Sequence, residues 1–320
     1  MQTKIVYVVV SSPNDYYLEQ SLLSVYSLKQ HNPNSNVVLV VDDDTNNSMS
    51  GKRSEILKYV DNVISVSIDD KYNMKQKSRY IKTNLREYIE GDFLYVDSDT
   101  IVTSNIEEVD NWNIEIGAVA DKHVPFKQHP TQYCIKRSSN VAGFDIDDDF
   151  IYFNSGVLFV KDCPLTRDFY KEWNRQWKKT LCYGMDADQP ALAVTNQKFG
   201  FVIKNIEGIW NCQLTDNGLK YFFNSKIIHY FASTAKNNIV SPYRYFQDTI
   251  YYDVKESGFI PEYLKRLIEN PYTGFEDVCR IVAKNDIFFL DSNIHKFYLN
   301  HAKSFVYFDQ LAKLINKLWK

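Results

Sequence analysis

Residues 92–100, DFLYVDSDT, join a short apolar run to two aspartates that flank one serine. Apolar runs rich in β-branched residues are typical of strands buried on both faces, and strands that alternate with helices form parallel sheets. Three such runs precede this one, separated by segments with helical spacing: IVYVVV (5–10), VVLVV (37–41) and NVISVSI (62–68). The sequence therefore predicts an α/β fold, a mainly parallel sheet flanked by helices.

The later part of the chain continues this pattern and then changes. Further elements are expected as a strand over 114–121, a polar loop to about residue 149, a strand over 152–160, a helix over 164–181 and a strand over 226–232. Beyond about residue 240 the strong strand runs stop and helical spacing dominates. We therefore expect a catalytic-type α/β domain over 1–240 and a mainly helical C-terminal extension over 241–320.

Composition excludes several classes of protein. The 320 residues are 44% hydrophobic and 24% charged, which is typical of a globular chain. Thirty-seven basic and forty acidic residues give a net charge of −3, so no whole-chain basic field would gather nucleic acid, and we expect no nucleic-acid partner. Five scattered cysteines without a CxxC pair fit reduced thiols and a cytoplasmic location.

Polar and acidic residues follow three of the predicted strands, in SSPNDYY (11–17), DDDT (42–45) and DSDT (97–100). Ligands of parallel α/β sheets bind at the carboxyl ends of the strands. Asp97 and Asp99 would point to the same side there and offer the hard oxygen ligands that Mg²⁺ and Mn²⁺ prefer. An isolated DxD segment fits a strand-end turn equally well, with an aspartate capping the next helix.

The DSD segment is one of five sequence segments that occur in a fixed order along the chain. They are VVSSPNDYY (9–17), YVDSDT (95–100), YFNSGVLFV (152–160), DADQPAL (186–192) and IIHYFA (227–232). Over about residues 4–236 the chain thereby resembles glycosyltransferase family 8, the retaining glycosyltransferases with a GT-A (Rossmann-like) fold that include glycogenin and bacterial lipooligosaccharide galactosyltransferases. The resemblance implies a UDP-sugar donor, and Mn²⁺, or Mg²⁺, bound to the diphosphate by Asp97, Asp99 and His229.

The resemblance also implies the donor site. For the nucleoside and the diphosphate it implies Ser11, Ser12, Asn14, Asp15, Tyr16, Ser98 and Lys236, with Tyr16 stacking on the base and Tyr17 as the alternative. For the sugar and the reaction it implies Arg79, Asp121, Asn154, Asp188 and Gln189. Arg79 equally fits a solvated helix charge beside Lys75, Lys77 and Lys82, and Asp186 or Asp188 equally fits a helix cap.

The segment after His229 departs from the family pattern. Ala232 stands where members commonly have glycine, the lysine comes one residue late as Lys236, and Asn237 and Asn238 replace a Pro-Trp pair. The asparagine that usually follows the DQ pair is replaced by Ala193. These changes leave the role of Lys236 open and suggest altered contacts with the sugar or the acceptor.

The resulting hypothesis is a retaining hexosyltransferase that moves a hexose from a UDP-sugar to a glycan, glycolipid or glycoprotein acceptor, forming an α-linkage. No side chain is an obvious double-displacement nucleophile, so attack from the same face, supported by Gln189 or by backbone oxygens, is favoured. One alternative is an inactive GT-A-like carbohydrate-binding or scaffold protein. Another is a nucleotidyltransferase, although a glycine-rich basic phosphate loop is absent from the N-terminal region.

The C-terminal residues show helical spacing of apolar groups. Phe305, Phe308, Ala312, Ile315 and Trp319 share one face, and Lys313, Lys317 and Lys320 lie mostly elsewhere. A terminal helix docked on the domain and an anchor on anionic lipid both fit this pattern. The second alternative would give a cytoplasmic protein a peripheral contact with the inner face of the membrane.

Overall fold

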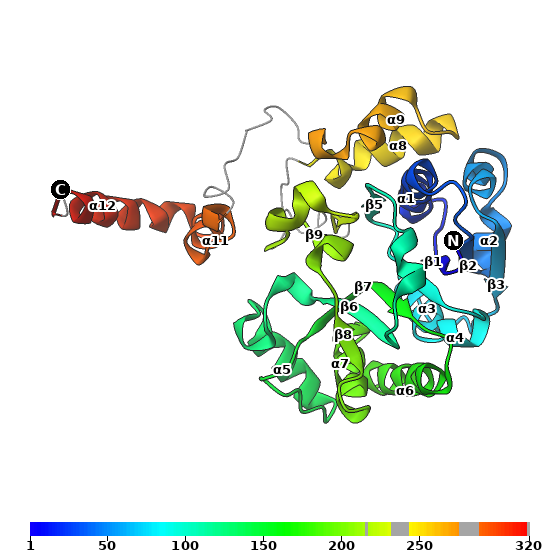
Figure 1. Ribbon diagram of the computed structural model, residues 1–320, viewed down its shortest axis with the longest axis horizontal. Helices are drawn as coiled ribbons and strands as arrows, with labels where there is room; N and C mark the ends of the chain where they lie inside the picture. The colour runs from blue at the N-terminus through cyan, green and yellow to red at the C-terminus, as the bar shows by residue number, and fades with distance from the viewer. Residues whose placement is uncertain (215–216, 232–242, 275–287, 319–320) are drawn as a thin grey trace. The chain divides into compact units, whose positions relative to one another are not determined.

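The computed structural model describes residues 1–214, 217–231, 243–274 and 288–318 (Figure 1). The chain divides into two compact units, residues 1–277 and 278–320. This division lies beyond the boundary that we expected near residue 240, because helices α8 (Asp248–Ser257) and α9 (Glu262–Glu269) pack against α1 (Tyr17–His31) inside the first unit. The functional division into a catalytic part and an extension stays a prediction.

The first unit is built on a seven-stranded sheet in the order β3-β2-β1-β4-β7-β6-β8. Among these strands only β7 runs against the others. The strands are β1 Lys4–Val9, β2 Val37–Asp42, β3 Asn62–Val66, β4 Phe93–Val96, β6 Ile116–Ala120, β7 Phe153–Val160 and β8 Ile203–Asn205. The predicted α/β class with a mainly parallel sheet is confirmed.

Helices cover both faces of this sheet, as the continuous apolar runs predict. Along β1 the side chains alternate: Ile5, Tyr7 and Val9 pack into the core beneath α1, and their neighbours pack into the core beneath α3 and α6. Besides α1, α8 and α9, the helices of this unit are α2 Asp43–Ser48, α3 Met74–Thr83, α4 Leu85–Tyr88, α5 Gln132–Val141, α6 Pro164–Leu181 and α7 Gln189–Lys198.

Two segments differ from expectation. The stretch expected as a polar loop to residue 149 contains α5, of which only Ser139 is buried. Between the second and third predicted strands, the segment with helical spacing includes a 3-10 helix, η1 (Gly51–Lys58). The second unit holds α11 (Asn293–Asn300) and α12 (Ala302–Leu318).

The DSD segment joins two sheets. Asp97 directly follows β4, and Thr100 begins β5 (Thr100–Val102) of a three-stranded sheet ordered β5-β10-β9. Its other strands are β9 (Cys212–Gln213) and β10 (Ile227–His229). Because β10 runs antiparallel to β5 with His229 opposite Thr100, the register brings His229 beside the DSD segment.

Within the described residues, no helix combines the length and apolar content required to cross a bilayer.

Candidate active site

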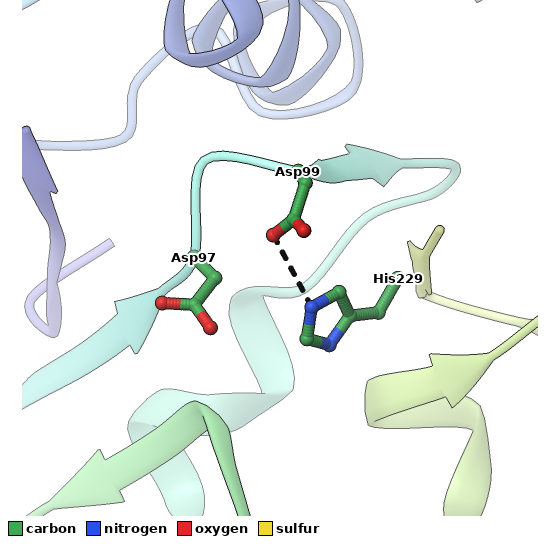
Figure 2. A group of neighbouring side chains, drawn as sticks. All are labelled: Asp97, Asp99 and His229. Carbon is green, nitrogen blue, oxygen red and sulfur yellow. Dashed lines mark ion pairs between the residues drawn. The ribbon is translucent and has the colours of Figure 1, made fainter. Parts of the chain in front are cut away.

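Asp97, Asp99 and His229 converge at the junction of the two sheets (Figure 2). One ligand atom from each lies within 4.8 Å of the others. His229 Nε2 is 3.2 Å from Asp99 Oδ1, and the backbone N–H of Tyr230 donates to the Asp99 carbonyl at 3.1 Å. Residues 130 positions apart in sequence therefore meet through strand register.

A second hydrogen bond fixes the orientation of the His229 ring. Its Nδ1 lies 3.0 Å from Oδ1 of Asn211, the last residue of η5 (Gly208–Asn211), and this oxygen can only accept. The proton therefore sits on Nδ1, and Nε2 faces the carboxylates. Burial alone would lower the pKa of His229, but the adjacent Asp99 carboxylate outweighs burial and raises it.

Gly156, on β7, forms the back of this cluster. A Cβ atom at this position would lie 2.4 Å from His229 Cε1, 2.7 Å from Asp97 Oδ2 and 2.9 Å from Asn154 Oδ1. Any side chain would therefore displace the candidate metal ligands. Glycine is needed here for a close approach, since its φ is not in the left-handed region.

Two carboxylates and one imidazole nitrogen form a donor set that suits Mn²⁺, which accepts both oxygen and imidazole ligands. The hydrogen bond from His229 Nδ1 to Asn211 is the kind of outer-shell contact that orients histidine ligands of metals. The residues present therefore fit a divalent cation.

A buried lysine, Lys82, to which the sequence assigned no role beyond that of a neighbour of Arg79, completes the cluster. Lys82, on α3, is 1% exposed, and its ammonium group lies 3.5 Å from Asp97 Oδ1, 3.2 Å from Asp188 Oδ2 and 3.0 Å from Ser155 Oγ. The hydroxyl of Tyr95 donates to the same Asp97 oxygen. The spacing in the sequence could have indicated that Lys82 belongs to the site, because Lys82 follows Arg79 by three residues and shares its helical face.

Asp188 directly precedes α7, but its side chain does not cap that helix. The carboxylate instead lies 3.1 Å from Arg79 Nε and accepts a hydrogen bond from Ser155 Oγ at 2.8 Å. Burial would raise the pKa of Asp188, but Lys82 and Arg79 outweigh it and lower the pKa. The readings of Asp188 as a helix cap and of Arg79 as a solvated charge are therefore wrong.

Asn154 and Asp121 lie on the other side of Gly156. Both are buried, and Asn154 Nδ2 donates to Asp121 Oδ1 at 2.8 Å. Gln189 begins α7 and donates from Nε2 to the carbonyl of Phe153 at 3.2 Å. The structure thus gathers both residues implied for the sugar and the DQ pair around β7.

The opening turn closes on itself. Asp15 accepts hydrogen bonds from Ser11 Oγ at 2.7 Å, from the Ser12 backbone at 2.8 Å and from the Tyr17 backbone at 3.1 Å. The Asn14 backbone donates to Ser12 Oγ at 3.2 Å. Asp15 is thus the centre of the turn, and its carboxylate is occupied by the turn itself.

Further contacts join this turn and the start of α1 to other parts of the first unit. The Ser11 backbone donates to Thr45 Oγ1 at 2.8 Å, and Arg53 donates to Ser11 Oγ at 3.0 Å. Ser98 Oγ accepts a hydrogen bond from Ser21 of α1 at 2.7 Å, which links the DSD segment to the helix that follows the turn. The ammonium group of Lys255, from α8, lies 4.9 Å from the centre of the Tyr16 ring and donates to the Asp15 carbonyl at 2.8 Å. Sequence analysis did not anticipate that α8 contacts the turn.

Lys236 lies outside the described residues, as do Ala232, Asn237 and Asn238. The other residues implied for the site are described, and they fall into two groups. One is the opening turn, and the other surrounds Asp97, Asp99 and His229. Asn211 and Ser155 support the second group: Asn211 lies outside the quoted motif segments, and Ser155 lies within YFNSGVLFV (152–160) but was given no role from the sequence.

Comparison with known proteins places the chain in a family. The sequence profile described as "Glycosyl transferase family 8" matches residues 8–236. No curated protein sequence matches at a significant level.

Similar solved structures include three glycosyltransferases. Mouse xyloside xylosyltransferase 1 is 15% identical, with a TM-score of 0.47, over 72% of this chain and 98% of that one. The galactosyltransferase LgtC is 18% identical, with a TM-score of 0.49, over 82% and 99%. GlyE of Streptococcus pneumoniae is 17% identical, with a TM-score of 0.48, over 88% and 67%. Since the family profile covers most of the chain and its ordered motifs meet in one site, the protein belongs to glycosyltransferase family 8.

Proposed function

We propose that this glycosyltransferase moves a hexose from a UDP-sugar to a glycan, glycolipid or glycoprotein acceptor, with retention at the anomeric carbon and a bound Mn²⁺. The observation that carries the proposal is the convergence of Asp97, Asp99 and His229 behind Gly156. The imidazole Nε2 is turned toward the carboxylates, and the hydrogen bond of Nδ1 to Asn211 holds the ring in this orientation.

The charges around the cluster support a metal-bound diphosphate. The partly exposed carboxylates of Asp97 and Asp99 and the buried carboxylate of Asp188 face two cationic side chains, Lys82 and Arg79. Three carboxylates against two cationic side chains leave a net negative charge. A bound divalent cation would make the net charge of the site positive, and a negatively charged diphosphate would complement it. When bound, the cation supplies Lewis-acid stabilisation of the leaving diphosphate.

The side chains of this site take distinct roles in the proposal. Asp97, Asp99 and His229 hold the cation, and Arg79 and Lys82 supply positive charge at the departing phosphate. Asn154 and Asp121 contact the donor sugar. Preorganised charges of this kind are commonly the largest catalytic contribution, because they need no rearrangement during the reaction.

The test is release of UDP from a panel of UDP-sugars, measured with and without Mn²⁺. Asp97→Asn should abolish the Mn²⁺-dependent release, because it removes one charged ligand from a cluster with only two carboxylates. Asp145→Asn, which changes an exposed aspartate in the loop before β7, is the matched control and should keep full activity. Release that does not depend on Mn²⁺ or Asp97 would contradict the proposal.

Retention by attack from the same face would be supported by Gln189, whose amide is held by the Phe153 carbonyl beside Asp188. Gln189→Ala should lower turnover without weakening Mn²⁺ binding. Nearly full turnover in this variant would remove Gln189 from the mechanism.

An inactive carbohydrate-binding protein is the second candidate, and the altered segment after His229 favours it. Binding of Mn²⁺ and UDP without turnover of any UDP-sugar would support this candidate.

We also propose that the second unit contacts anionic lipid at the inner face of the membrane in a cytoplasmic protein. On α12, Phe308 is 57%, Leu311 54% and Ile315 45% exposed, and Lys303 and Lys313 are exposed on the same helix. Exposed apolar side chains with neighbouring lysines suit a helix lying in a lipid interface. Co-sedimentation with vesicles that contain or lack anionic lipid tests this contact.

A further inference from the structure

A continuous series of buried hydrogen bonds begins at the imidazole of His229 and ends in the segment between β6 and β7. His229 Nδ1 donates to Asn211 Oδ1 at 3.0 Å, and Asn211 Nδ2 donates to Asn154 Oδ1 at 2.9 Å. Asn154 Nδ2 then donates to Asp121 Oδ1 at 2.8 Å. Each amide accepts through its oxygen on the His229 side and donates through its nitrogen on the Asp121 side. All the hydrogen bonds from His229 to Asp121 therefore run in one direction.

His129 ends the series. Its Nδ1 accepts a hydrogen bond from the Thr131 backbone at 3.2 Å, so the ring proton sits on Nε2, which donates to Asp121 Oδ2 at 2.8 Å. Both oxygens of Asp121 are therefore held, one by Asn154 and the other by His129. None of the sequence motifs includes His129, which lies just before α5.

Burial makes this series selective for one arrangement. The five residues of the series are at most 8% exposed: His129, Asp121, Asn154, Asn211 and His229. A buried polar group that loses its partner costs about 1–3 kcal/mol. Rotation of one member would leave its neighbours unpaired, so each side chain restricts the next.

The backbone between Asp121 and His129 gives independent support. Lys122 and His123 both have φ 55°, a left-handed conformation that is unfavourable for residues with a Cβ. Gln213, which is beside His229 in the β9–β10 register, holds this stretch by accepting from the Lys122 backbone at 2.6 Å and donating to the Ala120 carbonyl at 2.9 Å. A strained turn is thus fixed to the strand next to the candidate metal ligand.

We propose that His129 is a positioning residue for the cation site. By holding Asp121 it fixes the orientation of Asn154 and Asn211, and through them the ring of His229. The segment that carries His129 and the Mn²⁺ site then act as one unit, although His129 does not touch the cation. This inference rests on the proposed Mn²⁺ site.

The test measures the affinity of the full chain for Mn²⁺ in the presence of UDP, by electron paramagnetic resonance or calorimetry. His129→Leu removes the donor to Asp121 and should weaken Mn²⁺ binding about fivefold, below the ~10- to 100-fold range for direct outer-shell contacts. His129→Gln can place an amide N–H near the same position and should restore most of the affinity. His31→Leu, at the end of α1, is the control and should leave the affinity unchanged.

A double-mutant cycle separates transmission through the series from a general loss of packing. Asn211→Asp keeps the acceptor for His229 but removes the donor to Asn154. In this background His129→Leu should have no further effect on Mn²⁺ affinity, because the series is already broken. If the two effects add independently, the loss does not travel through Asn211, and the inference is wrong.

The outcomes also distinguish the inference from the function on which it rests. If the unmodified chain does not bind Mn²⁺ with UDP, the proposed function fails first and takes the inference with it. If that chain binds and folded His129→Leu binds equally well, only the inference is overturned. Should His129→Leu fail to fold, His129→Asn serves instead, since it stays polar but is too short to reach Asp121. Unchanged affinity in that variant overturns the inference as well.

Discussion

The two halves of the candidate donor site are built in different ways. The opening turn is held by hydrogen bonds among residues 11–17, with Asp15 at the centre, and by contacts of Ser11 with Thr45 and Arg53. The cation side takes its shape from side chains on α3, β7, α7, η5 and β10, which meet only when both sheets have formed. A change in the turn should therefore act locally, whereas a change on the cation side should spread to several residues.

Replacing Lys82 by methionine should have the largest effect on the cation side. The substitution leaves Asp97 and Asp188 with Arg79 as the remaining cationic neighbour, and removal of one partner from a buried ion pair costs ~3–5 kcal/mol. We expect the free energy of unfolding to fall by ~3 kcal/mol, measured by urea denaturation. Mn²⁺ should recover part of this loss, because a bound cation replaces the missing positive charge.

The matched control for this prediction is Lys75→Met on the same helix. The Lys75 side chain is 59% exposed and that of its partner Asp186 is 32% exposed, so we expect a loss of at most ~1 kcal/mol. That loss should not respond to Mn²⁺. Equal losses and equal responses in the two variants would show that the cation-side cluster has no special dependence on Lys82.

Gly156→Ala should separate metal binding from folding. The added methyl group meets side-chain atoms of His229, Asp97 and Asn154, which can move, so the fold should survive. The moved ligands no longer converge, and we expect Mn²⁺ affinity to fall by about 100-fold, the upper end of outer-shell effects. The control is Gly200→Ala, where φ is +70° but no atom lies within 4 Å of the added Cβ. It should lower stability slightly and leave Mn²⁺ affinity intact.

The same difference between the halves explains how much the sequence could predict. The strands, the helix over 164–181 and the strand-end acidic residues follow from local patterns, and the ordered motifs pointed to Asp97, Asp99 and His229. Lys82 received no role from the sequence because a lysine on a helix is usually solvated, and its burial depends on Asp188, which directly precedes α7 and is distant in sequence. Asn211 and His129 had no local signal, because their roles exist only through partners distant in sequence.

Asp15→Ala tests the local half. The variant removes the acceptor for Ser11, Ser12 and the Tyr17 backbone, so the turn should loosen and UDP affinity should fall about tenfold, which corresponds to ~1.4 kcal/mol. Asp15→Asn keeps one acceptor oxygen and should lose less. Calorimetry with UDP and with Mn²⁺ alone measures both ligands. A comparable loss of Mn²⁺ affinity would break the distinction between the two halves.

Acidification should destabilise the cation side at a higher pH than the opening turn. The expected loss of stability is smaller than the effects of the substitutions above. His123 accepts a hydrogen bond from the Gln213 backbone at 3.1 Å, and burial, reinforced by Lys220, lowers its pKa to about 3. An unfolded histidine has a pKa of ~6.5, so the unfolded chain binds more protons between these values. The contribution of His123 is complete above pH 6.5 and is lost as the pH falls toward 3.

We expect this loss to reach ~1 kcal/mol between pH 6.5 and ~5.5, seen as a difference in urea unfolding between the unmodified chain and His123→Gln, whose amide oxygen can still accept from Gln213. Other groups that titrate contribute to both chains and cancel in this difference. Hydrogen exchange locates the effect, because the Gln213 amide should lose protection as the pH falls while the Ser12 amide, held by Asp15, should not. Parallel loss of protection at both amides would mean that the two halves open together, and the cation side would then have no separate stability.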